Sequence, residues 1–210
     1  MRWALAILIL PAILLASLNT EYVKSAFAAE PSPFRQALPG YAYQFPRDMY
    51  SHDDFQIEWW YYTGNLEEAE TARPFGYQLT FFRVALDGTG RNPNPSKWNV
   101  GHVYFAHMTL TDVDGEKFHF FERINREGMG NAGAHSRRLM VWNEDWFLTD
   151  KDEAHWLKAV ESGTGIDLRL VPEKKIVIHG KDGISKKGRA EGNASHYFSY
   201  TRMKTSGTVF

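Results

Sequence analysis

A chain of 210 residues with a formal net charge of −1 and no cysteine is long enough to bury a core without disulfides. The balanced charge gives no reason to expect binding to nucleic acid or to an anionic membrane surface, and the lack of cysteine excludes thiolate nucleophiles and zinc–cysteine sites. Aromatic residues make up 15% of the chain and 17 residues are glycine, which favours a β-rich globular protein over a disordered one.

Residues 1–28 have the pattern of a secretory signal peptide. Arg2 supplies a positive charge, residues 4–18 form an uncharged apolar core, and Ala26-Phe27-Ala28 is a small-x-small cleavage pattern. The apolar core is shorter than the roughly 20 residues that a membrane-spanning helix needs. The sequence therefore predicts an exported protein, periplasmic or secreted, with an uncleaved membrane anchor as the alternative.

N-terminal sequencing of the protein from expressing cells is expected to show cleavage after Ala28 or Ala29, and soluble material that keeps Met1 would contradict this.

Residues 29–40 form a proline-containing lead-in, and residues 41–205 are expected to form one all-β domain, a lipocalin-like β-barrel. Short β-prone segments alternate with turn signals, a pattern typical of a sandwich or barrel. Asp114-Gly115 is a hairpin signal, and Ser162 to Gly165 is a second one. The expected strands are 56–63, 75–86, 102–111, 117–123, 139–148, 154–161, 165–171, 175–179 and 195–204.

The segment 149–161 has a competing helical interpretation. Thr149 with Asp152 imitates a capping box, and Trp156, Leu157 and Val160 would share a helical face. A glycine-rich turn follows at once, and apolar residues also alternate along the segment. The sequence therefore favours a strand over residues 154–161.

The first expected strand carries four consecutive aromatic residues, Trp59 to Tyr62, directly after Glu58. Neither this strand nor the next alternates cleanly between apolar and polar residues, so both faces are expected to be covered, as in a barrel with an internal cavity. The mixed face that carries Glu58, Trp60, Tyr62, Gln78 and Thr80 is expected to form the cavity wall. The candidate ligand-binding residues are Trp60, Tyr62, Gln78, Thr80, Arg83 and His107.

Glu58 has two interpretations. As a general acid in an aromatic pocket, it would protonate an apolar substrate whose developing carbocation the ring faces stabilise. As a structural carboxylate, it would pair with Arg83 or with a backbone donor, and structural ion pairs greatly outnumber catalytic acids. The histidines do not have metal-ligand spacing, since His102 and His107 are expected on opposite faces of one strand. No metal and no cofactor is therefore expected.

Four segments resemble the lipocalin-like CrtC/AttH family of carotenoid hydratases and predicted secreted hydrolases. They are IEWWYYTGNL, FGYQLTFFRVAL, HVYFAHMTLTDVDGEKFHFFERINREGMGNAGA and LVPEKKIVIHGKDGISKKGRAEGNASHYFSYTRM, and the resemblance spans residues 41–204. It implies two consecutive lipocalin-like barrels, of which this segment resembles the first, and residues 206–210 would begin the second. The family commonly has a proline where Asp53 stands here. The family's second barrel contains a segment of the Trp-x-Asp-His-Glu type that resembles the acid–base site of the hydratases. That barrel is not in this sequence, so no family catalytic residue is carried over.

The resulting expectation is an exported lipocalin-like domain that binds an apolar, isoprenoid-like small molecule. One alternative is an enzyme, a carotenoid hydratase-like lyase or an isoprenoid cyclase, that uses Glu58 as general acid. A secreted hydrolase ranks third, because the sequence has no Gly-x-Ser-x-Gly elbow. The expected partners are the apolar ligand and the second lipocalin-like domain, with no nucleic acid and no strong binding to a membrane surface.

Overall fold

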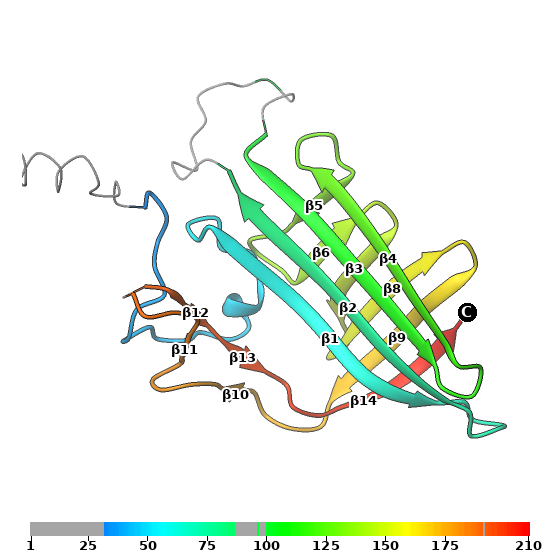
Figure 1. Cartoon of the computed structure of the whole chain (residues 1–210). Coiled ribbons are helices and arrows are strands. Elements are labelled where there is room, and N and C mark those ends of the chain that lie inside the picture. The colour runs from blue at the N-terminus through cyan, green and yellow to red at the C-terminus, as the bar shows by residue number, and fades with distance from the viewer. Residues whose placement is uncertain (1–31, 87–95, 97–99, 191) are drawn as a thin grey trace, which may run out of the picture. The chain divides into compact units, whose positions relative to one another are not determined.

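The computed structural model describes residues 32–86, 96, 100–190 and 192–210, which form an all-β domain (Figure 1). The first sheet has the order β1-β2-β3-β4 and every neighbouring pair is antiparallel. Its strands are β1 (Ile57–Glu67), β2 (Pro74–Ala85), β3 (His102–Asp112) and β4 (Lys117–Arg126). A short 3₁₀ helix, η1 (Arg47–Met49), precedes it. The predicted fold class is confirmed.

The second sheet has six strands in the order β14-β9-β8-β7-β6-β5. They are β5 (Ala132–Ala134), β6 (Met140–Asn143), β7 (Trp146–Lys151), β8 (Ala154–Glu161), β9 (Thr164–Pro172) and β14 (Met203–Val209). Between β9 and β14 the chain forms two small ladders, in which β10 (Val177–Ile178) pairs with β13 (Phe198–Ser199) and β11 (Ile184–Lys186) pairs with β12 (Ala194–His196). No helix among the described residues is long and apolar enough to cross a membrane.

The two large sheets pack face to face on one hydrophobic core. Alternate residues of each strand point inward, so every second side chain of β3, from Tyr104 to Leu110, is buried. Trp146 of β7 is fully buried in the same core. The core comprises Tyr77, Leu79, Phe81, Ala106, Met108, Leu110, Leu139, Val141, Trp146, Leu148, Leu157, Ala159, Ile166, Leu168 and Leu170.

Most predicted strands are confirmed, with the strand at 154–161 preferred correctly over a helix. The prediction of one strand over 139–148 is wrong, because the chain turns between β6 and β7, where Glu144 has a φ of 59°. The single strand predicted over 195–204 is also wrong, since β12, β13 and the start of β14 share that segment. Both predicted hairpins form, and β5 and β11 were not predicted.

Ser206 and Gly207 lie inside β14. Gly207 has a φ of 149°, and a Cβ there would lie 2.1 Å from the carbonyl oxygen of Asp167 on β9. Glycine at this position therefore permits a close approach of two backbones within the sheet rather than a reversal of the chain.

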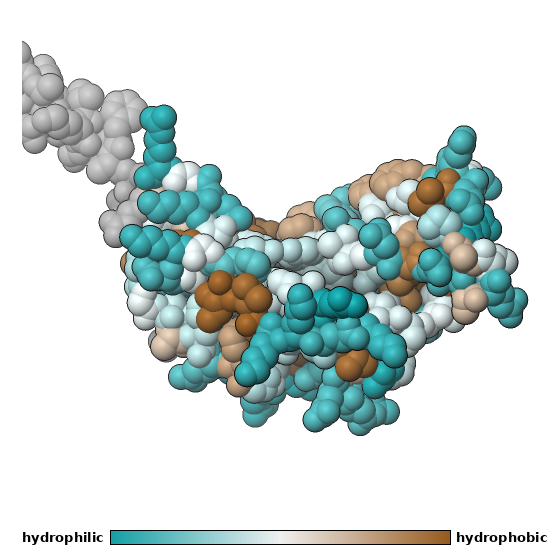
Figure 2. Space-filling model, turned by 90° about the horizontal axis from the view of Figure 1, so that it is seen from below, coloured by the Kyte–Doolittle hydropathy of each residue, from teal (hydrophilic) through white to brown (hydrophobic). Residues whose placement is uncertain are grey.

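Both faces of the first sheet were expected to be covered, but its outer face carries exposed apolar side chains. Phe118, Phe120 and Ile124 of β4 are 67%, 54% and 54% exposed, and Ile57 of β1 is 51% exposed. Figure 2 shows a view of the surface on which hydrophobic side chains gather in separate patches among hydrophilic ones. Within the described residues, the aromatic side chains of the first sheet thus lie on both of its faces, a buried inner face and a half-exposed outer face.

Candidate functional site

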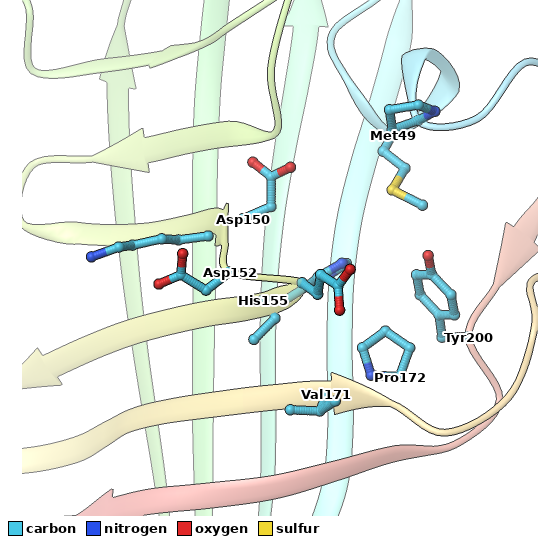
Figure 3. A pocket seen from close by; sticks show the side chains of 11 residues that line it. Met49, Asp150, Asp152, His155, Val171, Pro172 and Tyr200 are labelled. Atoms are coloured by element: carbon cyan, nitrogen blue, oxygen red, sulfur yellow. The ribbon is translucent and has the colours of Figure 1, made fainter.

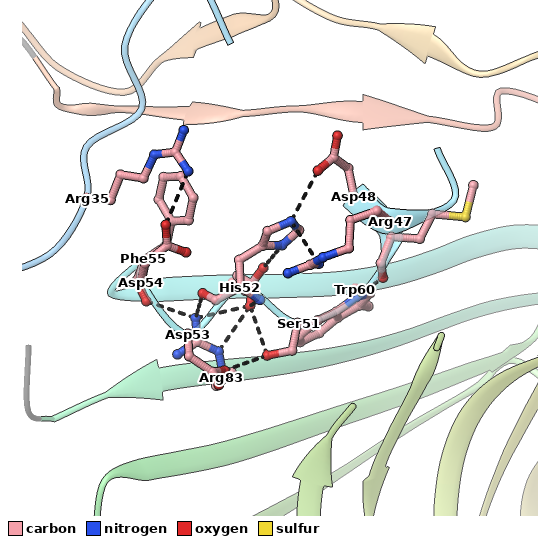
Figure 4. Close-up of polar contacts among 12 residues, drawn as sticks. Arg35, Arg47, Asp48, Ser51, His52, Asp53, Asp54, Phe55, Trp60 and Arg83 are labelled. Atoms are coloured by element: carbon pink, nitrogen blue, oxygen red, sulfur yellow. Dashed lines mark hydrogen bonds and ion pairs between the residues drawn. The ribbon is translucent and has the colours of Figure 1, made fainter. Parts of the chain in front are cut away.

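Glu58 and Arg83 form an ion pair of 3.0 Å at one end of the first sheet. Figure 4 shows Arg83 among residues of the segment before β1. The β1–β2 register places the two residues directly opposite each other. Arg83 is fully buried, and its Nε donates a hydrogen bond of 3.1 Å to Oε2 of Glu58. Its second terminal nitrogen donates to the backbone carbonyls of His52 at 2.7 Å and Phe55 at 2.8 Å. The guanidinium therefore ties the chain before β1 to both β1 and β2.

His52 lies between two carboxylates in the same network. Its backbone N–H donates to Oε2 of Glu58 at 2.8 Å, and its Nδ1 lies 2.7 Å from Oε1. Its Nε2 lies 3.2 Å from Asp48, which also accepts a 2.6 Å hydrogen bond from the Tyr41 hydroxyl. Burial alone would lower the pKa of His52, but the hydrogen bond and charge of Glu58, together with Asp48, raise it above its usual value.

Both oxygens of Glu58 are thus occupied by donors: Arg83, the His52 backbone and the His52 ring. The structural interpretation of Glu58 named these partners, Arg83 and a backbone donor. A general acid needs a free path from its proton to the substrate, and Glu58 is not among the residues that line the pocket described below. The geometry therefore favours the structural role, and the catalytic role of Glu58 stays an untested prediction.

The expected cavity wall is divided between two faces. Every β1–β2 partner pair joins an even-numbered residue to an odd-numbered one, so Trp60 lies opposite Phe81 and Tyr62 opposite Leu79. Trp60, Tyr62 and Arg83 therefore lie on the inner side, whereas Gln78 and Thr80 lie on the outer side with Tyr61. The prediction that Gln78 and Thr80 share a face with Trp60 is wrong, because the register of an antiparallel pair cannot be derived from the alternation within each strand.

His107 also lies on the outer face, because it pairs with Thr80 across β2–β3. Its ring lies 5.5 Å from Phe82 and 5.7 Å from Phe120, measured between ring centroids. Its Nε2 lies 2.8 Å from Oε2 of Glu122 on β4. The expectation that His107 shares a ligand site with Trp60 and Tyr62 does not fit this placement.

A pocket of about 450 Å³ opens where the inner face of the second sheet ends (Figure 3). On the inner face of the second sheet, Leu148 pairs with Leu157 across β7–β8. The next inward-facing pair along these strands is Asp150 with His155, and both of these residues line the pocket. Met49 and Tyr200 lie on the opposite side of the pocket (Figure 3). The lining residues are Pro46, Met49, Asp150, Lys151, Asp152, Glu153, Ala154, His155, Val171, Pro172 and Tyr200.

Segments far apart in the sequence build the Met49 side of the pocket. Met49 ends η1, and its carbonyl accepts a 2.8 Å hydrogen bond from Nε1 of Trp60 on β1. The ring of Phe45 packs edge-on against Phe198 of β13 at 4.8 Å, just before Tyr200. Trp60 therefore holds the pocket wall in place through the Met49 backbone.

His155 connects the pocket to the inner face of the first sheet. It is 7% exposed, and its Nδ1 lies 2.6 Å from the hydroxyl of Tyr62. Burial lowers the pKa of His155, although the charge of Asp150 opposes the shift, and burial raises the pKa of Tyr62. The pair is therefore neutral near pH 7. Sequence reasoning did not select His155, although the alternation of 155, 157 and 159 in the predicted strand contained the signal.

Within the part of the chain that the structure describes, no group of three or more histidine, aspartate or glutamate side chains is arranged to hold a metal ion.

Comparison with known proteins identifies a family and a similar solved structure. The AttH-like family profile matches residues 36–210. A crystal structure of a provisionally assigned AttH protein from Nitrosomonas europaea superimposes with a TM-score of 0.72 and 32% sequence identity. The match covers 83% of this chain and 51% of that chain, so the present chain spans about half the length of that relative. A search of curated proteins found no match.

Proposed function

The chain belongs to the AttH-like family, and from this premise we propose that its lipocalin-like domain binds an apolar small molecule in the pocket between η1 and β8. The observation that carries the proposal is the pocket itself. Its volume of about 450 Å³ lies in the range of roughly 300–1,000 Å³ typical of small-molecule sites. Met49, Pro172 and Tyr200 supply apolar wall, and His155 supplies a buried polar atom, the mixture by which such sites bind and orient a ligand.

The same proposal includes export, since residues 1–28 have the pattern of a signal peptide. An exported binding domain of this kind would carry an apolar compound in an aqueous compartment. The sequence resemblance to carotenoid hydratases makes isoprenoids the first class of ligand to test. Binding ranks above catalysis because both oxygens of Glu58 are held by donors and Glu58 does not line the pocket.

Met49→Trp is expected to weaken ligand binding at least tenfold, because the larger side chain would occupy space that a ligand needs. The backbone carbonyl of Met49, which accepts the Trp60 hydrogen bond, is unchanged by the exchange. Isothermal titration calorimetry with retinoids, carotenoids and fatty acids is the measurement, on protein without residues 1–28.

Met129→Trp is the matched control, since Met129 is 52% exposed and does not line the pocket. It adds the same side chain and should bind as the unchanged protein does. Saturable binding that Met49→Trp leaves intact would place the ligand elsewhere. The absence of saturable binding to every member of the panel would remove the proposal.

A further inference from the structure

We propose that His155 presents an N–H donor to the pocket and thereby selects a neutral ligand with an oxygen acceptor, such as a ketone or aldehyde, on an apolar body. This inference rests on the proposed binding function. It names the chemical class of the ligand, which the volume and the apolar wall of the pocket leave open.

The first step is the direction of the Tyr62–His155 hydrogen bond. The Tyr62 hydroxyl carries a proton that needs an acceptor, and His155 Nδ1, at 2.6 Å, is the acceptor that the described residues offer. If Nδ1 carried its own proton instead, the hydroxyl proton would be left without a partner inside the protein. An unsatisfied buried donor costs more than an oxygen lone pair left free, so the hydroxyl donates to Nδ1.

The second step is the tautomer of His155. A neutral imidazole carries one proton, and the nitrogen that accepts a hydrogen bond is the one without it. Since Nδ1 accepts from Tyr62, the proton of the neutral ring resides on Nε2. His155 therefore acts as a hydrogen-bond donor through Nε2, with its orientation fixed by Tyr62 from the other sheet.

The third step is that Nε2 is available to a ligand. Among the described residues, no hydrogen bond and no ion pair engages Nε2, and His155 lines the pocket. The residue is 7% exposed, so a ligand in the pocket would shield this donor from water. A donor shielded in this way favours a ligand that supplies an acceptor over one that cannot.

The charges of the residues that line the pocket indicate which class of oxygen acceptor the ligand carries. Asp150, Asp152 and Glu153 line the pocket with a single lysine, Lys151. This excess of negative charge disfavours a carboxylate ligand, because like charges repel. A neutral carbonyl oxygen satisfies the Nε2 donor without that repulsion. The preferred class is therefore a neutral oxygenated apolar molecule.

The test compares ligands of one chain length: a long-chain alkane, its methyl ketone, the carboxylic acid and the primary amine. The methyl ketone should bind roughly three- to tenfold tighter than the alkane, as expected for one neutral hydrogen bond. His155→Phe, which keeps a ring but removes the donor, should abolish that preference, so that the variant binds the alkane and the ketone with equal affinity. Binding that is strongest for the amine would show that the acidic rim dominates and would overturn the inference.

A second measurement addresses the tautomer without any ligand. Long-range ¹H–¹⁵N NMR of histidine-labelled full-length protein should show His155 as the Nε2–H form, and Tyr62→Phe should weaken that preference. An Nδ1–H tautomer would overturn the inference even if His155→Phe fails to fold. Equal binding of alkane and ketone overturns the inference and leaves the proposed function standing, whereas no binding of any ligand overturns both.

Discussion

Glu58→Gln is expected to lower the free energy of unfolding by about 3 kcal/mol, the lower end of the cost of breaking a buried ion pair. Arg83 is fully buried, and Glu58 is its carboxylate partner at 3.0 Å. The variant leaves the guanidinium charge in the interior with a neutral amide in place of a carboxylate. For a domain of this size the melting temperature should fall by roughly 6–12 °C.

Glu122→Gln is the matched control for this exchange. Glu122 pairs with His107 on the outer face of the first sheet, where its side chain is 43% exposed. Pairs exposed in this way contribute about 0–1 kcal/mol, so the control should melt within a few degrees of the unchanged protein. If Glu58→Gln melts like the control, the ion pair is not structural and the interpretation of Glu58 as a general acid regains support.

The pH dependence of stability gives the Glu58 prediction a second readout. The pKa of His52 is raised in the folded protein: burial opposes the shift, Glu58 and Asp48 favour it, and the charge of Arg47 works against it. A histidine whose pKa is higher in the folded than in the unfolded protein stabilises the folded state. This contribution is fully present below the unfolded pKa of about 6.5 and is lost as the pH rises through the folded pKa. Denaturant unfolding should therefore show Glu58→Gln costing more at about pH 6 than at about pH 8.

Alternation within strands determined how much of the fold the sequence could predict. The segments 75–86, 102–111 and 154–161 became β2, β3 and β8 almost residue for residue, because each is long and bounded by turn residues. The segment 139–148 did not, since its turn is made by Glu144, a residue with no typical turn signal, at a positive φ. The strand β5 was missed because its three residues, Ala132 to Ala134, are too few to show an alternation.

The candidate site was predicted only in part, for a different physical reason. Membership of a shared face within β1 follows from the sequence, so Trp60 and Tyr62 were correctly paired with each other. Their neighbours on β2 depend on the inter-strand register, which one residue of slip reverses. The pocket could not be predicted from the sequence, because Met49, His155 and Tyr200 come together only when η1, β8 and the segment after β13 are folded against one another.

The space between the sheets was expected to be a ligand cavity, and the described side chains there form a packed hydrophobic core. Trp60 and Tyr62 pack against the core, and Trp146 of β7 is fully buried within it. Nε1 of Trp146 donates to the Val160 carbonyl at 3.1 Å, and the guanidinium of Arg123 lies 4.4 Å from its ring centroid. The centre of the domain therefore stabilises the fold, and the proposed binding site lies at its end.

Trp146→Ala is expected to lower the free energy of unfolding by about 3–5 kcal/mol, because it removes a fully buried indole and leaves a cavity that the surrounding strands cannot fully close. Phe118→Ala, at a position 67% exposed, is the control for loss of an aromatic ring and should change stability by less than about 0.5 kcal/mol. Thermal and urea unfolding of both variants measure the difference.

Added indole should raise the melting temperature of Trp146→Ala and not that of the unchanged protein, because an apolar cavity accepts an apolar guest that stabilises the folded state. The variant should also keep its affinity for ligands of the end pocket, since Trp146 does not line that pocket. If Trp146→Ala instead costs less than about 1 kcal/mol and loses ligand affinity together with Met49→Trp, the ligand occupies the centre of the domain. The interior would then be a binding cavity, as the aromatic strands first suggested, and the pocket beside His155 would be its entrance.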